Sequence, residues 1–511
     1  MIHDFLGWII KYQNGAWSSL QNCFGYFGLH HVFHFFNYSI FRIFGTNHVA
    51  WYIVFAALSG VNVTLLYRLL LKIFREFGIQ KFRTIAFLSS LLFLIGPYQV
   101  EVVTWKACLH YIMTVMFFTS ILNLMYEFMI RKSQGKYLIG HHLLFVASLF
   151  TLEINLATPF ILLVFAFVFS MKDEWNWSIY LKKFFLPHIV ILAMYFLANK
   201  LILGEVVGHY GSDLHLNFDP SLLFSNGVSY FIKYTGLVHF WSFDARLSVY
   251  ESMKTISVMS GTVLFMLALV IWLYKKQRKD VHMMLSVGYL ISFFMALFPI
   301  ANLYLMYIVP FQNDRYGYFA SIFFYPFIIL LFFKLPALLR YIVLTIFLMA
   351  NIYFSYKTVW KCREAGLISA SLIESYRWYD DEEVRLVTIP DNYKGVYLFA
   401  DFHKESSETW NEALRIYGKQ EVKGNIIEYS HFLQSSDIDS FKYRIDHDTL
   451  HVEFKQYGNW FIRNGIGFTD FENDEIKASR KYNILRVELK DTTERTYIIP
   501  QAGVWEEVDF R

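Results

Sequence analysis

The sequence predicts a polytopic α-helical membrane protein of about ten spans, followed by a soluble α+β domain that is mainly β. The chain has 511 residues, of which 56% are hydrophobic and only 17% charged, whereas about a quarter of a soluble globular chain is charged. Aromatic residues make up 20%, and Trp and Tyr gather near the ends of the apolar runs, where an interfacial belt places them. The composition therefore indicates a chain that crosses a membrane several times.

Ten apolar runs predict the spans. Several of them are shorter than the ~20 residues that a simple span needs. The stretch 141–171 is interpreted as two short helices that are broken at Glu153-Ile154-Asn155. The runs are 49–71, 84–97, 108–128, 141–153, 156–171, 185–203, 257–274, 283–305, 318–334 and 337–356.

Clusters of basic residues in alternate loops predict the orientation. Lys and Arg mark cytoplasmic loops, so the remaining loops and everything after about residue 357 are expected on the non-cytoplasmic face. Compact loops without an organelle signal favour a bacterial inner membrane. The basic residues are Arg68, Lys72, Arg75, Lys81, Arg83, Arg131, Lys132, Lys136, Lys172, Lys182, Lys183, Lys275, Lys276, Arg278, Lys279, Lys334 and Arg340.

Three regions follow from this orientation: an outer-face segment 1–47, a multi-spanning domain 48–356 and a soluble extracytoplasmic domain 370–511. Because residues 1–47 contain no run long enough to span, we expect a further helix before them. Two amphipathic segments, His34–Phe44 and Leu222–Trp241, are interpreted as helices lying along the interface; Lys233 is one of the polar residues that make the second of them too polar for a span.

The soluble domain is predicted from a change of pattern. The segments Leu450–Phe454 and Ile484–Leu489 alternate with the two-residue period of half-buried strands. Glu408–Tyr417 reads as a short helix, which gives the domain its α element. No internal repeat is present in the sequence.

The segment Gln312-Asn313-Asp314-Arg315-Tyr316 lies between two long apolar runs. An ionised group near hydrocarbon costs several kcal/mol unless it is paired or solvated, so this Asp-Arg pair is a candidate binding site for an anion. The Arg315 guanidinium stays charged and makes bidentate hydrogen bonds with phosphate oxygens. The alternative is a structural ion pair of Arg315 with Asp314 or with Glu101.

Two further carboxylates lie in the predicted outer segments. Glu101 reads either as a carboxylate that positions substrate or transfers a proton, or as an interfacial residue that is hydrated or paired with Lys106. Asp4, next to the apolar segment Phe5–Ile10, reads either as a general base with a pKa tuned by partial burial or as an N-cap.

Glu153 lies among apolar residues before Pro159, which fits a paired structural role or a substrate contact. His30, His31 and His34 have a spacing that is common on interfacial helices, and the sequence predicts no metal site. The three cysteines are far apart and predict no disulfide framework. The sequence also has no Gly-rich phosphate loop, no zinc spacing and no nucleic-acid motif, so no nucleic-acid partner is expected.

Several short motifs, taken in order, resemble the GT-C superfamily of membrane glycosyltransferases. The likeness covers roughly residues 1–355 and is greatest to the branch of protein O-mannosyltransferases and of transmembrane O-mannosyltransferases with tetratricopeptide repeats. The chain departs from the family in its His-Asp pair, in the missing first helix and in a C-terminal domain without repeats. The motifs are His3-Asp4-Phe5, Phe44-Gly45-Thr46-Asn47-His48 with Asn62 and Leu65-Leu66-Tyr67, Pro97 through Glu101 with Trp105, Thr151-Leu152-Glu153 with Pro159, and Pro299–Leu303 with Asp314-Arg315-Tyr316, Tyr318 and Ser321.

The resemblance implies an inverting glycosyltransferase that moves a sugar from a polyprenyl-phosphate donor to an acceptor hydroxyl on the outer face. It implies that Asp4 takes the acceptor proton, that Arg315 neutralises the phosphate and that Glu101 orients a substrate. No cofactor is expected, and the partners are the donor, membrane lipid and an unknown protein or glycan acceptor. The expected substrate-binding residues are Arg315, Asp314, Tyr316, His110, Lys106 and Glu153.

Three other functions fit the same composition. A transporter or flippase of lipid-linked glycans would share the aromatic bundle, although it should show repeats or broken helices. A glycan polymerase or ligase would use a pyrophosphate donor at the same face. A non-catalytic membrane scaffold would present the β-rich domain.

Overall fold

The computed structural model of the chain divides into two compact units, one formed by Asn14–Tyr356 and the other by Met1–Gln13 together with Lys357–Arg511. Each unit is described by itself. The structure describes residues 3–13, 15, 29–130, 135–170, 176–204, 206, 219–255, 280–301, 303, 313–376, 384–389, 392–393, 396–399, 406–418, 426–432, 441–454, 460–462, 470–472, 474, 476–481, 484–490, 496–501 and 503–508.

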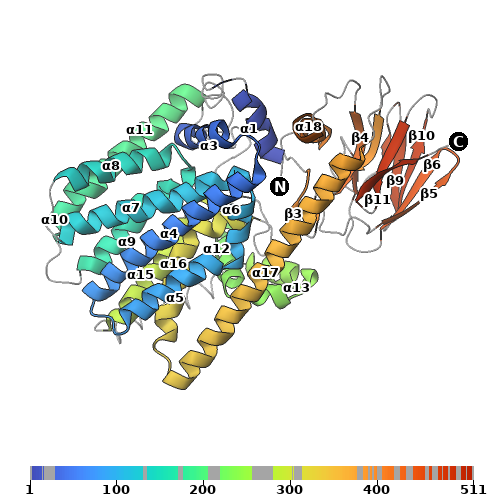
Figure 1. Ribbon diagram of the computed structural model, residues 1–511. Coiled ribbons are helices and arrows are strands. Elements are labelled where there is room, and N and C mark those ends of the chain that lie inside the picture. Colours follow the sequence, from blue (N-terminus) through green and yellow to red (C-terminus); the bar gives the residue numbers. More distant parts are fainter. Residues whose placement is uncertain are drawn as a thin grey trace. The chain divides into compact units, whose positions relative to one another are not determined.

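The unit Asn14–Tyr356 is a bundle of helices (Figure 1). The last helix of the bundle, α17, continues into the second unit. The helices are α3 (His31–Phe44), α4 (His48–Glu76), α5 (Phe82–Ile95), α6 (Val100–Thr104), α7 (Leu109–Ile130), α8 (Gly135–Leu149), α9 (Thr158–Ser170), α10 (Trp177–Tyr180), α11 (Leu186–Leu203), α12 (Pro220–Tyr234), α13 (Phe243–Met253), α15 (Val281–Leu297), α16 (Asp314–Phe332) and α17 (Ala337–Ser375).

Among the described residues, seven helical segments are long and apolar enough to cross a membrane, and a bent pair makes a possible eighth. The predicted run 141–153 forms α8, whose 15 residues span about 22 Å, less than the ~30 Å of a hydrocarbon core. The predicted run 257–274 lies outside the described residues. The seven segments are His48–Glu76, Lys106–Met129, Glu153–Ser170, Trp177–Leu203, Val281–Ile300, Asp314–Phe332 and Ala337–Ser375.

The bent pair joins α5 to Pro97–Thr104 at an angle of 51°. Pro97 explains the bend, because proline has no N–H to donate and disfavours helical geometry in the residue before it; Gly96 is accordingly extended, with ψ at 139°. A side chain at position 96 would clash with the Tyr325 hydroxyl, so glycine lets α16 approach the bend closely. The bend turns α6 away from the axis of α5.

The predicted break within 141–171 is confirmed. The helix α8 ends at Leu149, a 3-10 turn covers Glu153–Ala157, and α9 begins at Thr158. The Asn155 side chain donates to the carbonyls of Ser148 and Leu152 at 2.9 and 3.0 Å. These bonds add to the backbone hydrogen bonds that the same two carbonyls accept from Thr151, Leu152 and Asn155, so the break is held by side chain and backbone together.

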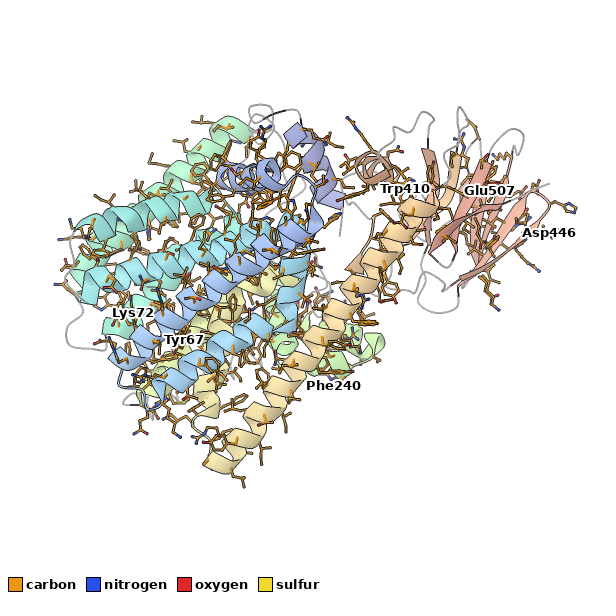
Figure 2. The ribbon with its side chains drawn as sticks, viewed as in Figure 1. Tyr67, Lys72, Phe240, Trp410, Asp446 and Glu507 are labelled. Carbon is orange, nitrogen blue, oxygen red and sulfur yellow. The ribbon has the colours of Figure 1, made fainter. Side chains whose placement is uncertain are left out.

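Charged side chains also tie the helices together away from the candidate site. Lys72, near the end of α4 (Figure 2), donates to Asn123 and Glu127 on α7, each at 2.6 Å. The pair is partly buried, so losing one partner would cost more than it would on an open surface.

The last apolar helix is longer than predicted. The predicted apolar run ends at residue 356, whereas α17 has 39 residues and continues to Ser375. Its second half is polar but contains good helix formers, so hydropathy alone marked its end too early. The predicted start of the soluble domain, residue 370, lies inside α17.

The second unit holds α1 (His3–Gln13), α18 (Ser406–Ala413) and two five-stranded sheets. The first sheet is mixed, in the order β12-β11-β1-β4-β7, and the second is antiparallel, in the order β5-β6-β10-β9-β8. The strands are β1 (Val384–Ile389), β4 (Ile426–Phe432), β5 (Phe441–Asp446), β6 (Thr449–Phe454), β7 (Trp460–Ile462), β8 (Phe471–Glu472), β9 (Ile476–Lys481), β10 (Ile484–Leu489), β11 (Thr496–Gln501) and β12 (Val504–Val508), with a hairpin of β2 (Asn392–Tyr393) and β3 (Val396–Tyr397).

Strand β11 shows how this unit is layered. Tyr497 and Ile499 pack in one core with the second sheet, whereas Ile498 packs in another core with Leu6 of α1 and Trp410 of α18 (Figure 2). Alternate residues of a strand point to opposite faces, so the first sheet is covered on both sides. The two predicted strands, Leu450–Phe454 and Ile484–Leu489, lie in β6 and β10 and pair with each other.

Candidate functional site

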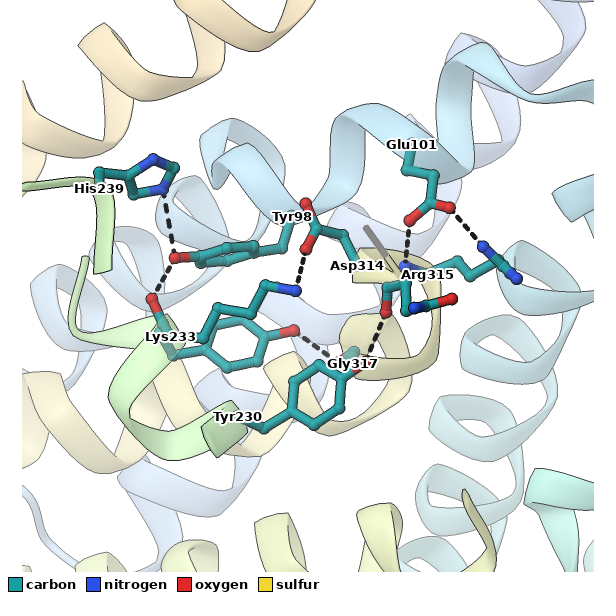
Figure 3. A network of polar contacts seen from close by, with 10 residues as sticks. Tyr98, Glu101, Tyr230, Lys233, His239, Asp314, Arg315 and Gly317 are labelled. Atoms are coloured by element: carbon teal, nitrogen blue, oxygen red, sulfur yellow. Dashed lines mark hydrogen bonds and ion pairs between the residues drawn. The ribbon is translucent and has the colours of Figure 1, made fainter. Parts of the chain in front are cut away.

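Glu101 lies in α6, just after the Pro97 bend, and its side chain is only 4% exposed. One carboxylate oxygen accepts from the backbone N–H of Arg315 at 2.8 Å, and the other accepts from Arg315 Nη1 at 2.6 Å (Figure 3). Arg315 is the second residue of α16, where backbone N–H groups have no partner inside the helix and a negative charge is favoured. Glu101 therefore caps α16 from another helix.

The Arg315 guanidinium is held between protein groups, and the side chain as a whole remains 12% exposed. Its central carbon lies 4.6 Å from the ring centre of Trp105 and 4.6 Å from that of Tyr316, which is cation–π geometry. Nη2 also donates weakly to the Tyr316 hydroxyl, at 3.4 Å. Of the two structural ion pairs that the sequence left open for Arg315, the structure contains the one with Glu101.

Asp314 forms an ion pair with Lys233 of α12 instead (Figure 3). The two side chains are 2% and 0% exposed. The Lys233 ammonium also lies 5.8 Å from the ring centre of Tyr98 and 5.4 Å from that of Tyr230. Two adjacent residues at the start of α16 thus direct opposite charges to two different helices.

Lys233 is a site residue that was not predicted from the sequence, and so are Tyr230 and Tyr234 of the same helix. Lys233 was taken only as a sign that Leu222–Trp241 was too polar for a span. A stronger signal was present: no acidic residue lies within four positions of Lys233, so a helical neighbour cannot neutralise it. A lysine in such an apolar and aromatic segment needs a carboxylate from elsewhere in the fold.

Two tyrosines of α12 hydrogen-bond to backbone carbonyls at the start of α16. Tyr230 donates to the carbonyl of Asn313, and Tyr234 donates to that of Gly317 at 2.6 Å (Figure 3). Burial, with smaller contributions from Tyr325 and Asp314, raises the pKa of Tyr234 well above its usual value. The hydroxyl therefore stays protonated and keeps donating this bond at ordinary pH.

Gly317→Ala is expected to destabilise the protein by about 1–3 kcal/mol, the usual cost of overpacking. A methyl group there would lie 2.6 Å from the Tyr234 hydroxyl oxygen and 2.8 Å from Tyr230 Cε1. The measurement is denaturant unfolding in detergent. The control is Gly60→Ala in α4, where no atom lies within 4 Å; equal effects of the two substitutions would contradict the packing argument.

Lys106 and His110 lie close to this group in sequence but have other contacts. The Lys106 ammonium hydrogen-bonds with His48 Nδ1 at the start of α4, so the predicted alternative of a Glu101–Lys106 pair gives way to Glu101–Arg315. His110 packs edge-on against Phe33, with ring centres 4.9 Å apart. Its neighbour Tyr111 meets the Tyr316 ring edge-on at 6.0 Å.

Glu153 lies outside this group of residues and pairs with His30. Both of its carboxylate oxygens lie 2.8 Å from His30 Nε2, and the two side chains are 12% and 7% exposed. This contact joins the break before α9 to the start of α3. It corresponds to the paired structural role that the sequence left open for Glu153.

Asp4 is placed by its backbone alone. It lies in α1, which belongs to the unit of Met1–Gln13 and Lys357–Arg511, whereas Glu101 and Arg315 belong to the other unit. Its side chain lies outside the described part of the structure. The prediction that Asp4 is a general base therefore stays a prediction from the sequence.

The apolar helices define a membrane protein, and the two sheets give it a C-terminal β region. Comparison with known proteins finds no family model, no curated protein and no solved structure that matches the chain. The likeness to the GT-C superfamily accordingly rests on the sequence motifs alone.

Proposed function

We propose that the protein is an inverting glycosyltransferase that uses a polyprenyl-phosphate sugar and acts at the outer face of a membrane. The observation that carries the proposal is Arg315, a fixed cation at the start of an apolar helix whose side chain is still 12% exposed. Such a group fits the phosphate of a donor whose lipid tail lies in the bilayer. The sequence motifs around it supply the class of reaction.

Arg315 would act on the leaving group. In a single displacement, the acceptor oxygen forms a bond to the anomeric carbon while the bond from that carbon to the phosphate oxygen breaks. The bonding electrons leave with the polyprenyl phosphate, and a preorganised guanidinium stabilises the developing charge. The acceptor proton would pass to Asp4, which remains the candidate for the general base.

The geometry favours a positioning role for Glu101 over proton transfer. Both of its oxygens already accept hydrogen bonds from Arg315, at 2.8 and 2.6 Å. A carboxylate held in this way keeps the guanidinium in one orientation, and because both of its oxygens already accept from Arg315 it is poorly placed to take a proton from a substrate. Glu101→Gln should therefore act through the placement of Arg315.

The same contacts favour one alternative, a non-catalytic membrane scaffold. The Glu101–Arg315 pair caps α16, which is a sufficient structural reason for both residues. The two functions differ in what Arg315→Ala does. In an enzyme it abolishes transfer in protein that still folds, whereas in a scaffold it changes stability alone.

The test is sugar transfer by the purified full-length chain from a panel of polyprenyl-phosphate sugars, with wild type beside Asp4→Asn and Arg315→Ala. The matched control is Arg340→Ala, because Arg340 also lies over two rings, at 5.1 and 5.2 Å. We expect both site variants to lose transfer while Arg340→Ala keeps it. Unchanged transfer in the site variants would overturn the site, and no transfer from any donor would overturn the function.

A further inference from the structure

Three histidines outside the candidate site come together between two helices of the bundle. His141 and His142 lie on α8, and His188 lies on α11, which packs against α8. One ring nitrogen from each residue lies within 4.8 Å of the others. His141 and His188 are fully buried, and His142 is partly buried. We call this group the three-histidine cluster.

Backbone carbonyls fix the protonation of two of the rings. His141 Nδ1 lies 3.0 Å from the carbonyl oxygen of Ile121, and His142 Nε2 lies 2.9 Å from that of Lys183. A carbonyl only accepts, so each of these nitrogens carries the hydrogen. The lone pairs of the neutral rings are therefore on His141 Nε2 and His142 Nδ1.

The carbonyl that orients His142 follows from the sequence. Residue 187, four positions after Lys183, is proline, which has no N–H to close the usual helical bond to the Lys183 oxygen. The chain is π-helical over Leu181–Phe185, an irregularity that is frequent at functional sites. The Lys183 oxygen is thus open to the imidazole.

A cluster without a metal leaves atoms unaccounted for. His188 Nε2 lies 3.0 Å from His141 Nε2, so one hydrogen bond between the two rings explains that contact. Within the described part of the chain, however, His142 Nδ1 and His188 Nδ1 have no hydrogen-bond partner. A buried polar atom without a partner is costly, and in the His142 ring that atom is the nitrogen that carries the lone pair.

We propose that the three-histidine cluster binds a divalent transition-metal ion of the Zn²⁺ type. Neutral imidazoles suit such ions, and a metal-bound histidine usually donates its other N–H to a carbonyl or carboxylate, as His141 and His142 do here. Zinc–nitrogen bonds of about 2.0–2.1 Å place the ligand atoms at most about 4 Å apart. The three nitrogens lie within 4.8 Å of one another, so binding would require the rings to move closer together by less than about 1–2 Å.

The surroundings of the three-histidine cluster are also compatible with a bound metal ion. Lys182 and Lys183, beside the cluster, are exposed, which marks this end of the helices as a polar boundary. Three neutral imidazoles leave the ion with its full charge, so a fourth ligand, either water or an anion such as hydroxide, would complete the coordination. The ion would join α8 to α11 and is independent of the proposed sugar transfer.

The test measures metal directly in the full-length chain, purified in detergent through a tag without histidine. The protein is equilibrated with Zn²⁺, desalted and analysed for metal, and the visible ligand-field spectrum is recorded with Co²⁺. We expect one ion per chain in wild type and a loss of affinity greater than the ~10–100-fold of an outer-shell change in His142→Gln. That variant alters the least buried ligand.

The control is His282→Gln, since His282 lies on α15, apart from the three ligands. It should keep the ion, the Co²⁺ spectrum and any rise of the melting temperature with Zn²⁺, and His142→Gln should lose all three while eluting as a monodisperse species. Wild type that takes up no Zn²⁺ or Co²⁺ would overturn the proposal. Equal uptake by wild type and a His141→Gln/His188→Gln variant would overturn it as well.

Discussion

Lys233→Met is expected to lower the free energy of unfolding by about 3–5 kcal/mol, because it leaves the Asp314 carboxylate buried without its counter-charge. The two side chains are 0% and 2% exposed, so water cannot replace the lost partner. Methionine has nearly the volume of the lysine stem, which keeps the loss of packing small. Denaturant unfolding in detergent, followed by tryptophan fluorescence, measures the change.

The control for this prediction is Lys254→Met. Lys254 pairs with Glu251 at 2.8 Å, but the side chains are 37% and 55% exposed, and exposed pairs contribute about 0–1 kcal/mol. The double variant Lys233→Met/Asp314→Leu should recover much of the loss, because no charge is left buried. If Lys233→Met lowers the free energy of unfolding no more than Lys254→Met does, the Asp314 carboxylate does not depend on Lys233 for its counter-charge, and the prediction is wrong.

Arg315→Lys is expected to reduce sugar transfer by about 100–1000-fold, the loss that follows removal of one preorganised donor from an active site. Lysine keeps the charge but lacks the planar fork. It would lose both the hydrogen bond from Nη1 to Glu101 and the contacts at 4.6 Å with Trp105 and Tyr316. The measurement is the initial rate with the donor that wild type uses.

Two comparisons make this result specific. Arg340→Lys changes an arginine with similar ring contacts outside the site and should leave the rate unchanged. Tyr316→Phe keeps the ring contact, removes the weak 3.4 Å bond from Nη2 and should lower the rate by less than tenfold. If Arg315→Lys and Arg340→Lys transfer sugar at the same rate, the guanidinium of Arg315 does not stabilise the leaving group.

The sequence predicted features that depend on neighbours along the chain. The break at Glu153–Asn155 was visible in a short polar interruption, and the strands β6 and β10 were visible in their two-residue period. The full length of α17 was not visible in the sequence, because hydropathy detects only apolar residues. The polar part of a helix is stabilised by backbone hydrogen bonds and by the helix propensity of its residues, which hydropathy does not measure.

Pairing between distant residues was beyond the sequence pattern. Arg315 had two candidate partners, Asp314 beside it and Glu101 far before it, and the sequence left the choice between them open. Consecutive helical residues point in different directions, so Asp314 and Arg315 reach different helices. The three-histidine cluster was hidden for the same reason, since His188 lies far along the chain from His141 and His142.

The two ion pairs at the start of α16 have a consequence for biogenesis. Glu101 and Lys233 are translated before Asp314 and Arg315, so each of them waits for its counter-charge until the ribosome has passed the start of α16. A nascent chain that stalls earlier holds a carboxylate and an ammonium that hydrocarbon does not tolerate alone. Synthesis of one dipeptide then supplies both counter-charges, before the rest of α16 and the whole of α17 have been made.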